Sequence, residues 1–90
     1  MIFISLIPGT GPRTPERARA IAAECLDYMR TVFPDGPWDF TITIGRELRP
    51  VITRTFRASQ EDKALRWLVR ELERPGTSVS VGYLCVGRQS

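Results

Sequence analysis

In the stretch Trp38-Asp39-Phe40-Thr41-Ile42-Thr43-Ile44, apolar and polar residues alternate along the chain. A period of two is typical of a β-strand that buries one face and leaves the other in water. Residues 45–50 include Gly45 and Pro50 and have the length of a hairpin connection, so residues 51–57 are predicted to form the returning strand. The middle of the chain is therefore expected to be a β-hairpin.

A helix is predicted on each side of this hairpin. The first begins with Thr14 as its N-cap and Pro15 at the first helical position, and it is expected to end near Phe33. Its predicted buried face consists of Ala18, Ile21, Ala22, Cys25, Met29 and Val32. The second is expected to begin at Ser59, with Asp62 in an approximate capping box, and to end before Pro75. Its apolar stripe is formed by Ala64, Leu65, Leu68, Val69 and Leu72.

Strands are predicted at both ends of the chain, over residues 1–7 and 79–86. The order β-α-β-β-α-β within 90 residues predicts a single α+β domain with the ferredoxin-like, split β-α-β fold. In that fold one four-stranded antiparallel sheet has its first and third strands at the centre, and both helices cover the same face. The other face of the sheet is then expected to be open.

The amino-acid composition limits which partners and which catalytic or metal-binding groups the chain can have. There are 13 basic and 10 acidic side chains, which give a net charge of +3 and a pI near 9.4, and this mildly favours a polyanionic partner. The chain has no His and no Asn, so a histidine base, an imidazole metal ligand and an Asn oxyanion donor are excluded. No pair of acidic residues is spaced as an acid–base couple. We therefore expect no enzymatic activity, no cofactor and no metal.

The two cysteines and the N-terminal segment indicate the cellular compartment and whether a membrane is involved. Cys25 and Cys85 belong to no C-x-x-C pattern, so each is expected to be a small buried hydrophobe in a reduced, cytoplasmic protein. The segment from Met1 to Pro8 has no positive leader and is too short for a membrane span. No membrane association is expected.

The open face of the sheet is the first candidate for partner binding. Its predicted contact residues are Phe3, Ile7, Arg54, Phe56, Leu84 and Val86. Contiguous apolar surface of this kind is seldom left uncovered in a monomer. The placement of the third strand is open: Arg54 and Phe56 share a face, and if that face is turned inward Arg54 must find a carboxylate. If they face outward, the platform resembles RNA-recognition-motif domains, although residues 49–56 lack that family's Gly-aromatic pattern.

The second helix offers another candidate surface. Lys63, Arg66, Arg70 and Arg74 form a basic stripe at spacings of three, four and four, and Trp67 is expected at its border or exposed. Exposed Trp beside Arg is typical of an interface hot spot. The alternative is a solvated helix face in which Trp67 covers the Arg stems.

Two loops carry further basic residues. Arg13 follows Gly9-Thr10-Gly11-Pro12 before the first helix, which suggests either a structural turn or a weak anion site. Small acylphosphatases place an Arg-bearing phosphate loop there, but they need an Asn that this chain lacks. Arg46 and Arg49 are expected to be exposed turn residues.

The sequence thus favours a non-enzymatic protein–protein interaction module that docks onto itself as a homodimer, or onto a larger complex. Small inhibitors encoded by phages and other mobile elements, including anti-CRISPR proteins, are similar in size and in their lack of catalytic residues. The alternative is a nucleic-acid-binding domain that uses the Arg and aromatic residues of the sheet face or the basic stripe of the second helix. A third hypothesis is a small-ligand binder or enzyme with a cavity between two copies.

Overall fold

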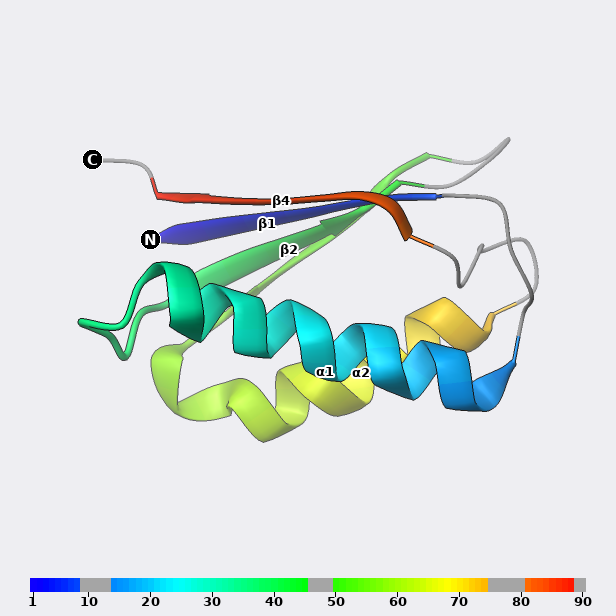
Figure 1. Cartoon of the computed structure of the whole chain (residues 1–90), viewed down its shortest axis with the longest axis horizontal. Helices are drawn as coiled ribbons and strands as arrows, with labels where there is room; N and C mark the ends of the chain where they lie inside the picture. The colour runs from blue at the N-terminus through cyan, green and yellow to red at the C-terminus, as the bar shows by residue number, and fades with distance from the viewer. Residues whose placement is uncertain (9–13, 46–49, 75–80, 89–90) are drawn as a thin grey trace.

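The computed structural model describes residues 1–8, 14–45, 50–74 and 81–88. Its elements are β1 (Ile2–Pro8), α1 (Pro15–Val32), β2 (Phe40–Ile44), β3 (Ile52–Phe56), a 3-10 turn η1 (Ala58–Gln60), α2 (Glu61–Glu73) and β4 (Val81–Arg88). Both helices lie side by side on one face of a four-stranded sheet (Figure 1). The α+β class, the element order and the placement of both helices on one face are confirmed.

The strand order differs from the ferredoxin-like prediction. The sheet runs β3-β2-β1-β4, with β1 and β2 at the centre and β3 and β4 at the edges. β1 and β2 are parallel, whereas the β2–β3 and β1–β4 pairs are antiparallel. The sheet is therefore mixed, and the predicted antiparallel sheet with a central third strand is wrong.

The charge on β3 gives a physical reason for this order. The β2–β3 pairing places Arg54 opposite Ile42 and Phe56 opposite Phe40, so both share the face that the helices cover. In a central strand the Arg54 guanidinium would be buried, which is costly for a charge without a partner. At the edge of the sheet, Arg54 reaches solvent and is exposed. β2 carries only Ile, Phe and Thr, and it takes the central position instead.

Helix α1 begins as predicted. The Thr14 hydroxyl oxygen accepts a hydrogen bond from the backbone N–H of Arg17 at 3.1 Å, and Pro15 occupies the first turn. Its buried residues are Ala18, Ile21, Ala22, Cys25, Leu26 and Met29. Val32, predicted to be buried, is 38% exposed, and Leu26 is buried in addition to the predicted residues.

Helix α2 is rotated relative to the predicted face. Its buried residues are Ala64, Trp67, Leu68, Glu71 and Leu72, while Leu65 and Val69 are only half-buried. The rotation brings the Trp67 ring against Phe56 of β3, with 5.5 Å between ring centroids in an edge-on arrangement. Ser59, the predicted N-cap, lies inside η1, and the helix begins two residues later.

The core lies between the helices and the two central strands. β1 contributes Ile2, Ile4 and Leu6, and β2 contributes Phe40, Ile42 and Ile44. All six side chains are fully or almost fully buried, and β1 therefore presents Phe3, Ser5 and Ile7 to the open face, as predicted. Cys25 is buried and unpaired, as expected, while the side chain of Cys85 lies outside the described residues.

Candidate functional site

Four cations gather around Trp67 where α2 passes β3. Lys63, Arg66 and Arg70 come from successive turns of α2, and Arg54 reaches them from the edge strand. Together with Trp67, these four residues line a hollow of about 310 Å³, and we call the four cations the basic cluster. Each of them is exposed. The spacings of three and four residues place the α2 members on one helix face, as the sequence predicts.

Trp67 forms the floor of this hollow. Its side chain is only 8% exposed, so the prediction of an exposed or border position is wrong. Phe56 lies beneath it and stacks in turn on Phe40, with ring centroids 5.6 Å apart. The Arg54 guanidinium lies 5.2 Å from the Phe56 centroid and 6.0 Å from the Trp67 centroid. These aromatic faces hold Arg54 by cation–π attraction and orient its charge into the hollow.

No acidic side chain of the described residues forms an ion pair with the basic cluster. Within the described part of the chain, no carboxylate oxygen lies within ion-pair distance of Arg54, Lys63, Arg66 or Arg70. Four like charges around one hollow repel each other, and an anion bound between them relieves that repulsion. All four side chains are hydrogen-bond donors only, so the hollow suits anion binding.

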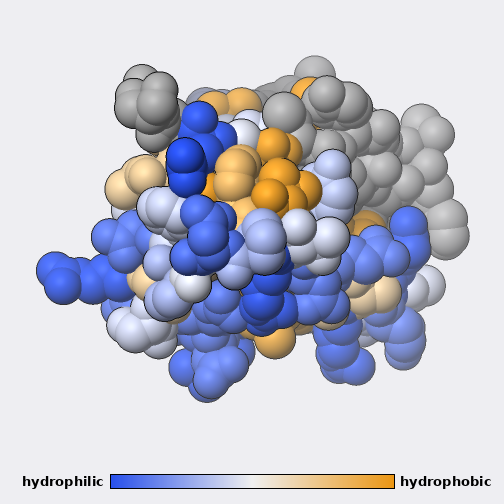
Figure 2. Space-filling model, turned by 60° about the vertical axis from the view of Figure 1, so that its left-hand side comes forward, coloured by the Kyte–Doolittle hydropathy of each residue, from blue (hydrophilic) through white to orange (hydrophobic). Residues whose placement is uncertain are grey.

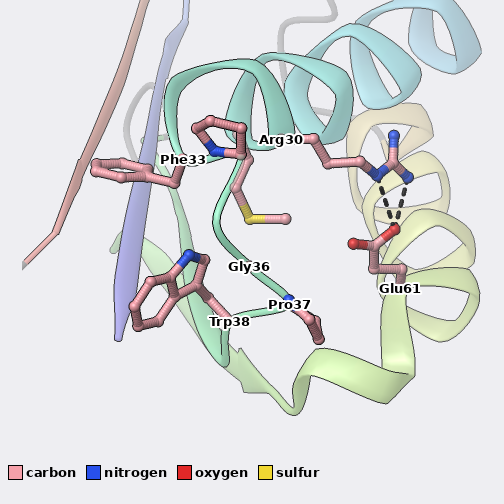
Figure 3. Close-up of a pocket in the computed structure, with 8 residues that line it drawn as sticks. Arg30, Phe33, Gly36, Pro37, Trp38 and Glu61 are labelled. Atoms are coloured by element: carbon pink, nitrogen blue, oxygen red, sulfur yellow. Dashed lines mark hydrogen bonds and ion pairs between the residues drawn. The ribbon is translucent and has the colours of Figure 1, made fainter.

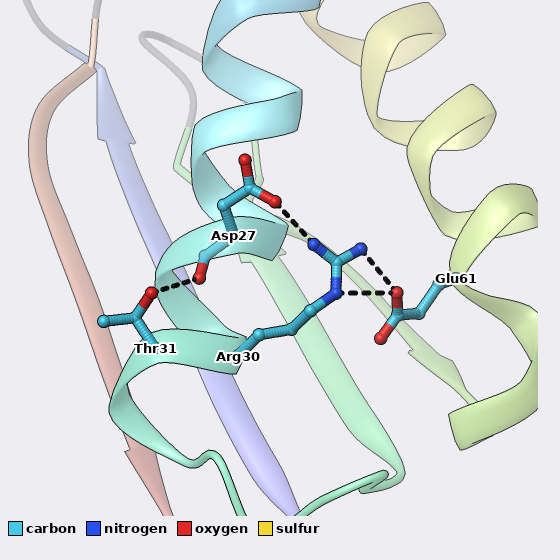
Figure 4. A network of polar contacts seen from close by, with 4 residues as sticks. All are labelled: Asp27, Arg30, Thr31 and Glu61. Atoms are coloured by element: carbon cyan, nitrogen blue, oxygen red, sulfur yellow. Dashed lines mark hydrogen bonds and ion pairs between the residues drawn. The ribbon is translucent and has the colours of Figure 1, made fainter.

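Two other basic residues, Arg30 and Arg74, are paired with carboxylates. Arg30 of α1 donates two hydrogen bonds to one carboxylate oxygen of Glu61 on α2, and it also pairs with Asp27 (Figure 4). The hydrogen bond to Glu61 raises the pKa of Arg30 above its ordinary value.

Arg74, predicted as the fourth member of the stripe, pairs instead with Glu71 at 3.5 Å. Arg13, Arg46 and Arg49 lie outside the described residues.

The open sheet face differs from the predicted platform. Phe3 and Ile7 do lie on it and are 39% and 49% exposed. Arg54 and Phe56 lie on the helix side, and Val86 pairs with Ile4 and packs against the core, so their predicted placement is wrong. Leu84 pairs with core-facing Leu6, and its side chain lies outside the described residues.

Threonines occupy the β2–β3 half of the open face. The Thr41 and Thr55 hydroxyls are 2.9 Å apart, and those of Thr43 and Thr53 are 3.1 Å apart. These cross-strand pairs satisfy one another and make the β2–β3 half of the face polar. Among the described residues, the exposed apolar surface at the β1 side of this face includes Met1, whose sulfur lies 3.2 Å from the Thr41 hydroxyl, together with Phe3 and Ile7.

A second pocket lies where α1 ends. It has a volume of about 240 Å³, and Figure 3 shows Phe33, Pro37 and Trp38 along it, with the Arg30–Glu61 pair closing one side. The Trp38 Nε1 atom is buried and has no hydrogen-bond partner, and Arg88 stacks on the indole at 4.8 Å. Figure 2 views this end of the molecule and shows an orange apolar patch bordered by hydrophilic side chains. Because Arg30 and Glu61 are already paired and Nε1 is covered, this pocket offers no free charge to a ligand.

Residues 1–8, 14–45, 50–74 and 81–88 contain no group of three or more His, Cys, Asp or Glu side chains that could hold a metal ion. Neither α1 nor α2 is long and apolar enough to cross a membrane.

Comparison with protein-family models, with curated proteins and with solved structures finds no significant match.

Proposed function

We propose that this protein is a non-enzymatic docking module that binds an acidic surface of a partner protein through the basic cluster. The observation that carries the proposal is the hollow lined by Arg54, Lys63, Arg66 and Arg70, none of which has a carboxylate partner among the described residues. A folded protein ordinarily intersperses its surface charges, so an unbalanced group of this kind supports an anionic partner.

The buried aromatic residues favour a protein over a single-stranded nucleic acid. Proteins that bind single strands combine a basic groove with exposed aromatic rings on which bases stack. Here Trp67 and Phe56 are 8% and 2% exposed, and Arg54 lies over both rings. The described residues of the hollow thus supply charge without a stacking platform. Carboxylates on a partner need only the charge and the donors.

The open sheet face is a weaker candidate for docking. Phe3 and Ile7 are exposed on it, but they are flanked by threonine pairs that are already hydrogen-bonded. The few exposed apolar side chains described on this face cover less area than a stable homodimer interface requires. We therefore assign the main contact to the helix side of the molecule.

A charge-matched pair of variants tests the proposal. Arg66→Gln combined with Arg70→Gln removes two charges from the basic cluster, and Arg17→Gln combined with Arg57→Gln removes two exposed charges elsewhere. Fluorescence anisotropy would measure binding to a labelled polyglutamate peptide and to a labelled DNA oligonucleotide at low salt. We expect the first variant to bind the peptide about tenfold more weakly, since two exposed charge pairs together contribute about 1.4 kcal/mol. The second variant should bind within about twofold of the unmodified protein.

Two results would contradict the proposal. Equal losses in both variants would show that net charge, rather than the basic cluster, determines binding. Tighter binding to the oligonucleotide, with a log–log salt slope of about −0.7 per phosphate contact, would establish the nucleic-acid alternative instead.

A further inference from the structure

A groove between the two helices adjoins the basic cluster. It has a volume of about 660 Å³, and the described residues that line it all belong to α1 or α2. Ala23 of α1 and Leu65 and Val69 of α2 form its apolar floor, and Arg19, Arg66, Arg70 and Glu73 form its rims. The rotation of α2 toward β3 creates this floor, because it leaves Leu65 and Val69 at the border of the core, where both pack against it but are only half-buried.

Arg66 and Arg70 connect the groove to the basic cluster, since they line both hollows. The rims carry three Arg against one Glu, and Lys63 and Arg54 extend the positive charge beyond them. A partner that fills the groove therefore meets apolar surface along its centre and cations along one flank. This combination favours an occupant with an apolar stripe beside acidic residues.

The secondary structure that lines the groove indicates which conformation of an occupant fits it. The groove is lined by two helices whose N–H and C=O groups are used within the helices, so it offers no edge to which a β-strand could add. A helix satisfies its own backbone groups and needs no such edge, so the groove favours a helical occupant. From Leu65 to Glu73 the groove follows α2 for about 12 Å, which is about two helical turns at 1.5 Å per residue.

We infer that the groove between α1 and α2 binds an acidic amphipathic helix of a partner protein, with its apolar stripe on Ala23, Leu65 and Val69 and its carboxylates toward Arg66 and Arg70. The inference rests on the proposed function and specifies the partner's binding element. A phosphate backbone would match the cations but would leave the apolar floor exposed to water. A second copy of this chain carries a net charge of +3, which opposes its approach to the same cations.

Two peptides of identical composition test the inference. One is an 18-residue helix with Leu at positions i, i+3, i+4 and i+7 and Glu on the adjoining face, and the other has the same residues in scrambled order. Binding would be followed by NMR titration of the full chain to millimolar peptide. We expect the amphipathic peptide to bind at least tenfold more tightly than the scrambled one. The amide signals of Ala23, Leu65 and Val69 should shift, and those of Thr43 and Thr53 on the open sheet face should not.

The chain offers a matched control substitution. Val69→Ser lies in the groove, whereas Val32→Ser changes a valine that is exposed at the end of α1. Val69→Ser is expected to weaken binding of the amphipathic peptide at least fivefold, and Val32→Ser less than twofold. The shift pattern of the unmodified chain decides the question even if Val69→Ser fails to fold.

The outcomes separate this inference from the proposed function. If both peptides bind equally and Arg66→Gln/Arg70→Gln weakens the binding of both, the inference about the groove is wrong and the role of the basic cluster is supported. Shifts confined to the open sheet face, or tighter binding of a DNA oligonucleotide, would overturn the groove as well. Binding that discriminates between the peptides but survives Arg66→Gln/Arg70→Gln would support the groove and contradict the proposed role of the cluster.

Discussion

At the scale of a single residue, the buried thiol of Cys25 causes the free energy of unfolding to decrease at alkaline pH. It is fully buried in α1, and burial raises the pKa of its thiol from 9.0 to about 12. The unfolded chain releases this proton above pH 9, whereas the folded chain retains it until about pH 12. The contribution to stability is therefore complete below pH 9 and decreases as the pH rises from 9 toward 12.

We expect the free energy of unfolding to decrease by about 1.4 kcal/mol at pH 10 through Cys25 alone. Guanidinium unfolding at pH 7.5 and pH 10 would measure this decrease in the unmodified protein and in Cys25→Ala. The variant should lose less stability between the two pH values, because Ala has no proton to release. An identical decrease in both proteins would contradict the assignment.

The residues of the basic cluster show how far a helical stripe can be predicted from sequence. Lys63, Arg66 and Arg70 lie on one face, as their spacing indicates, because a helix fixes the direction of each side chain. The burial of Trp67 could not be derived in the same way. It depends on Phe56, which comes from an edge strand whose position the sequence does not reveal. Arg54 comes from the same strand, and the sequence leaves open which face of that strand is turned toward the helices.

At the scale of an element, the start of α1 depends on one hydroxyl group. The Thr14 hydroxyl oxygen accepts a hydrogen bond from the backbone N–H of Arg17, which would otherwise have no partner within the helix. We expect Thr14→Ala to destabilise the protein by about 1 kcal/mol and to lower the melting temperature by about 4–8 °C, measured by circular dichroism. Thr31→Ala is the control, because the Thr31 hydroxyl donates to the carbonyl of Asp27 inside the same helix. Its melting temperature should be unchanged or slightly higher, since Ala favours helix. Equal losses in both variants would show that the cap contributes nothing specific.

The two helices differ in how well their faces could be predicted. Five of the six residues assigned to the buried face of α1 are buried, since a long helix with a regular apolar stripe has one way to face the core. In α2 the predicted stripe included Leu65 and Val69, but the observed face turns toward Trp67. The stripe of Ala64, Leu68 and Leu72 is flanked by Leu65 and Val69 on one side and by Trp67 on the other, and burial of the large Trp ring turns the helix toward the Trp67 side. The groove between α1 and α2 is the consequence.

At the scale of the whole molecule, the element order was predictable and the strand order was not. A β2–β3 hairpin can enter the sheet with either strand next to β1, and both arrangements bury β1 and cover one face with helices. The mixed pattern of β3, with Arg54 between Ile52 and Phe56, was the available signal for an edge strand. The strength of this signal depends on the desolvation cost of burying the Arg54 guanidinium. A pattern of alternating apolar and polar residues does not report that cost.

The position of β2 gives a direct test of the strand order in solution. β1 and β2 are parallel neighbours, with Phe3 opposite Thr41 and Ser5 opposite Thr43. NMR should therefore detect backbone NOEs between residues 3–6 and 41–44, together with antiparallel NOEs between β2 and β3. The amides of β2 that point toward β1 should exchange slowly with deuterium, because both sides of a central strand are hydrogen-bonded. In the ferredoxin-like order those amides would face solvent and exchange within minutes, and β1 would show NOEs to residues 52–56. That second pattern would contradict the observed sheet and would place Arg54 beneath the helices, which would remove it from the basic cluster.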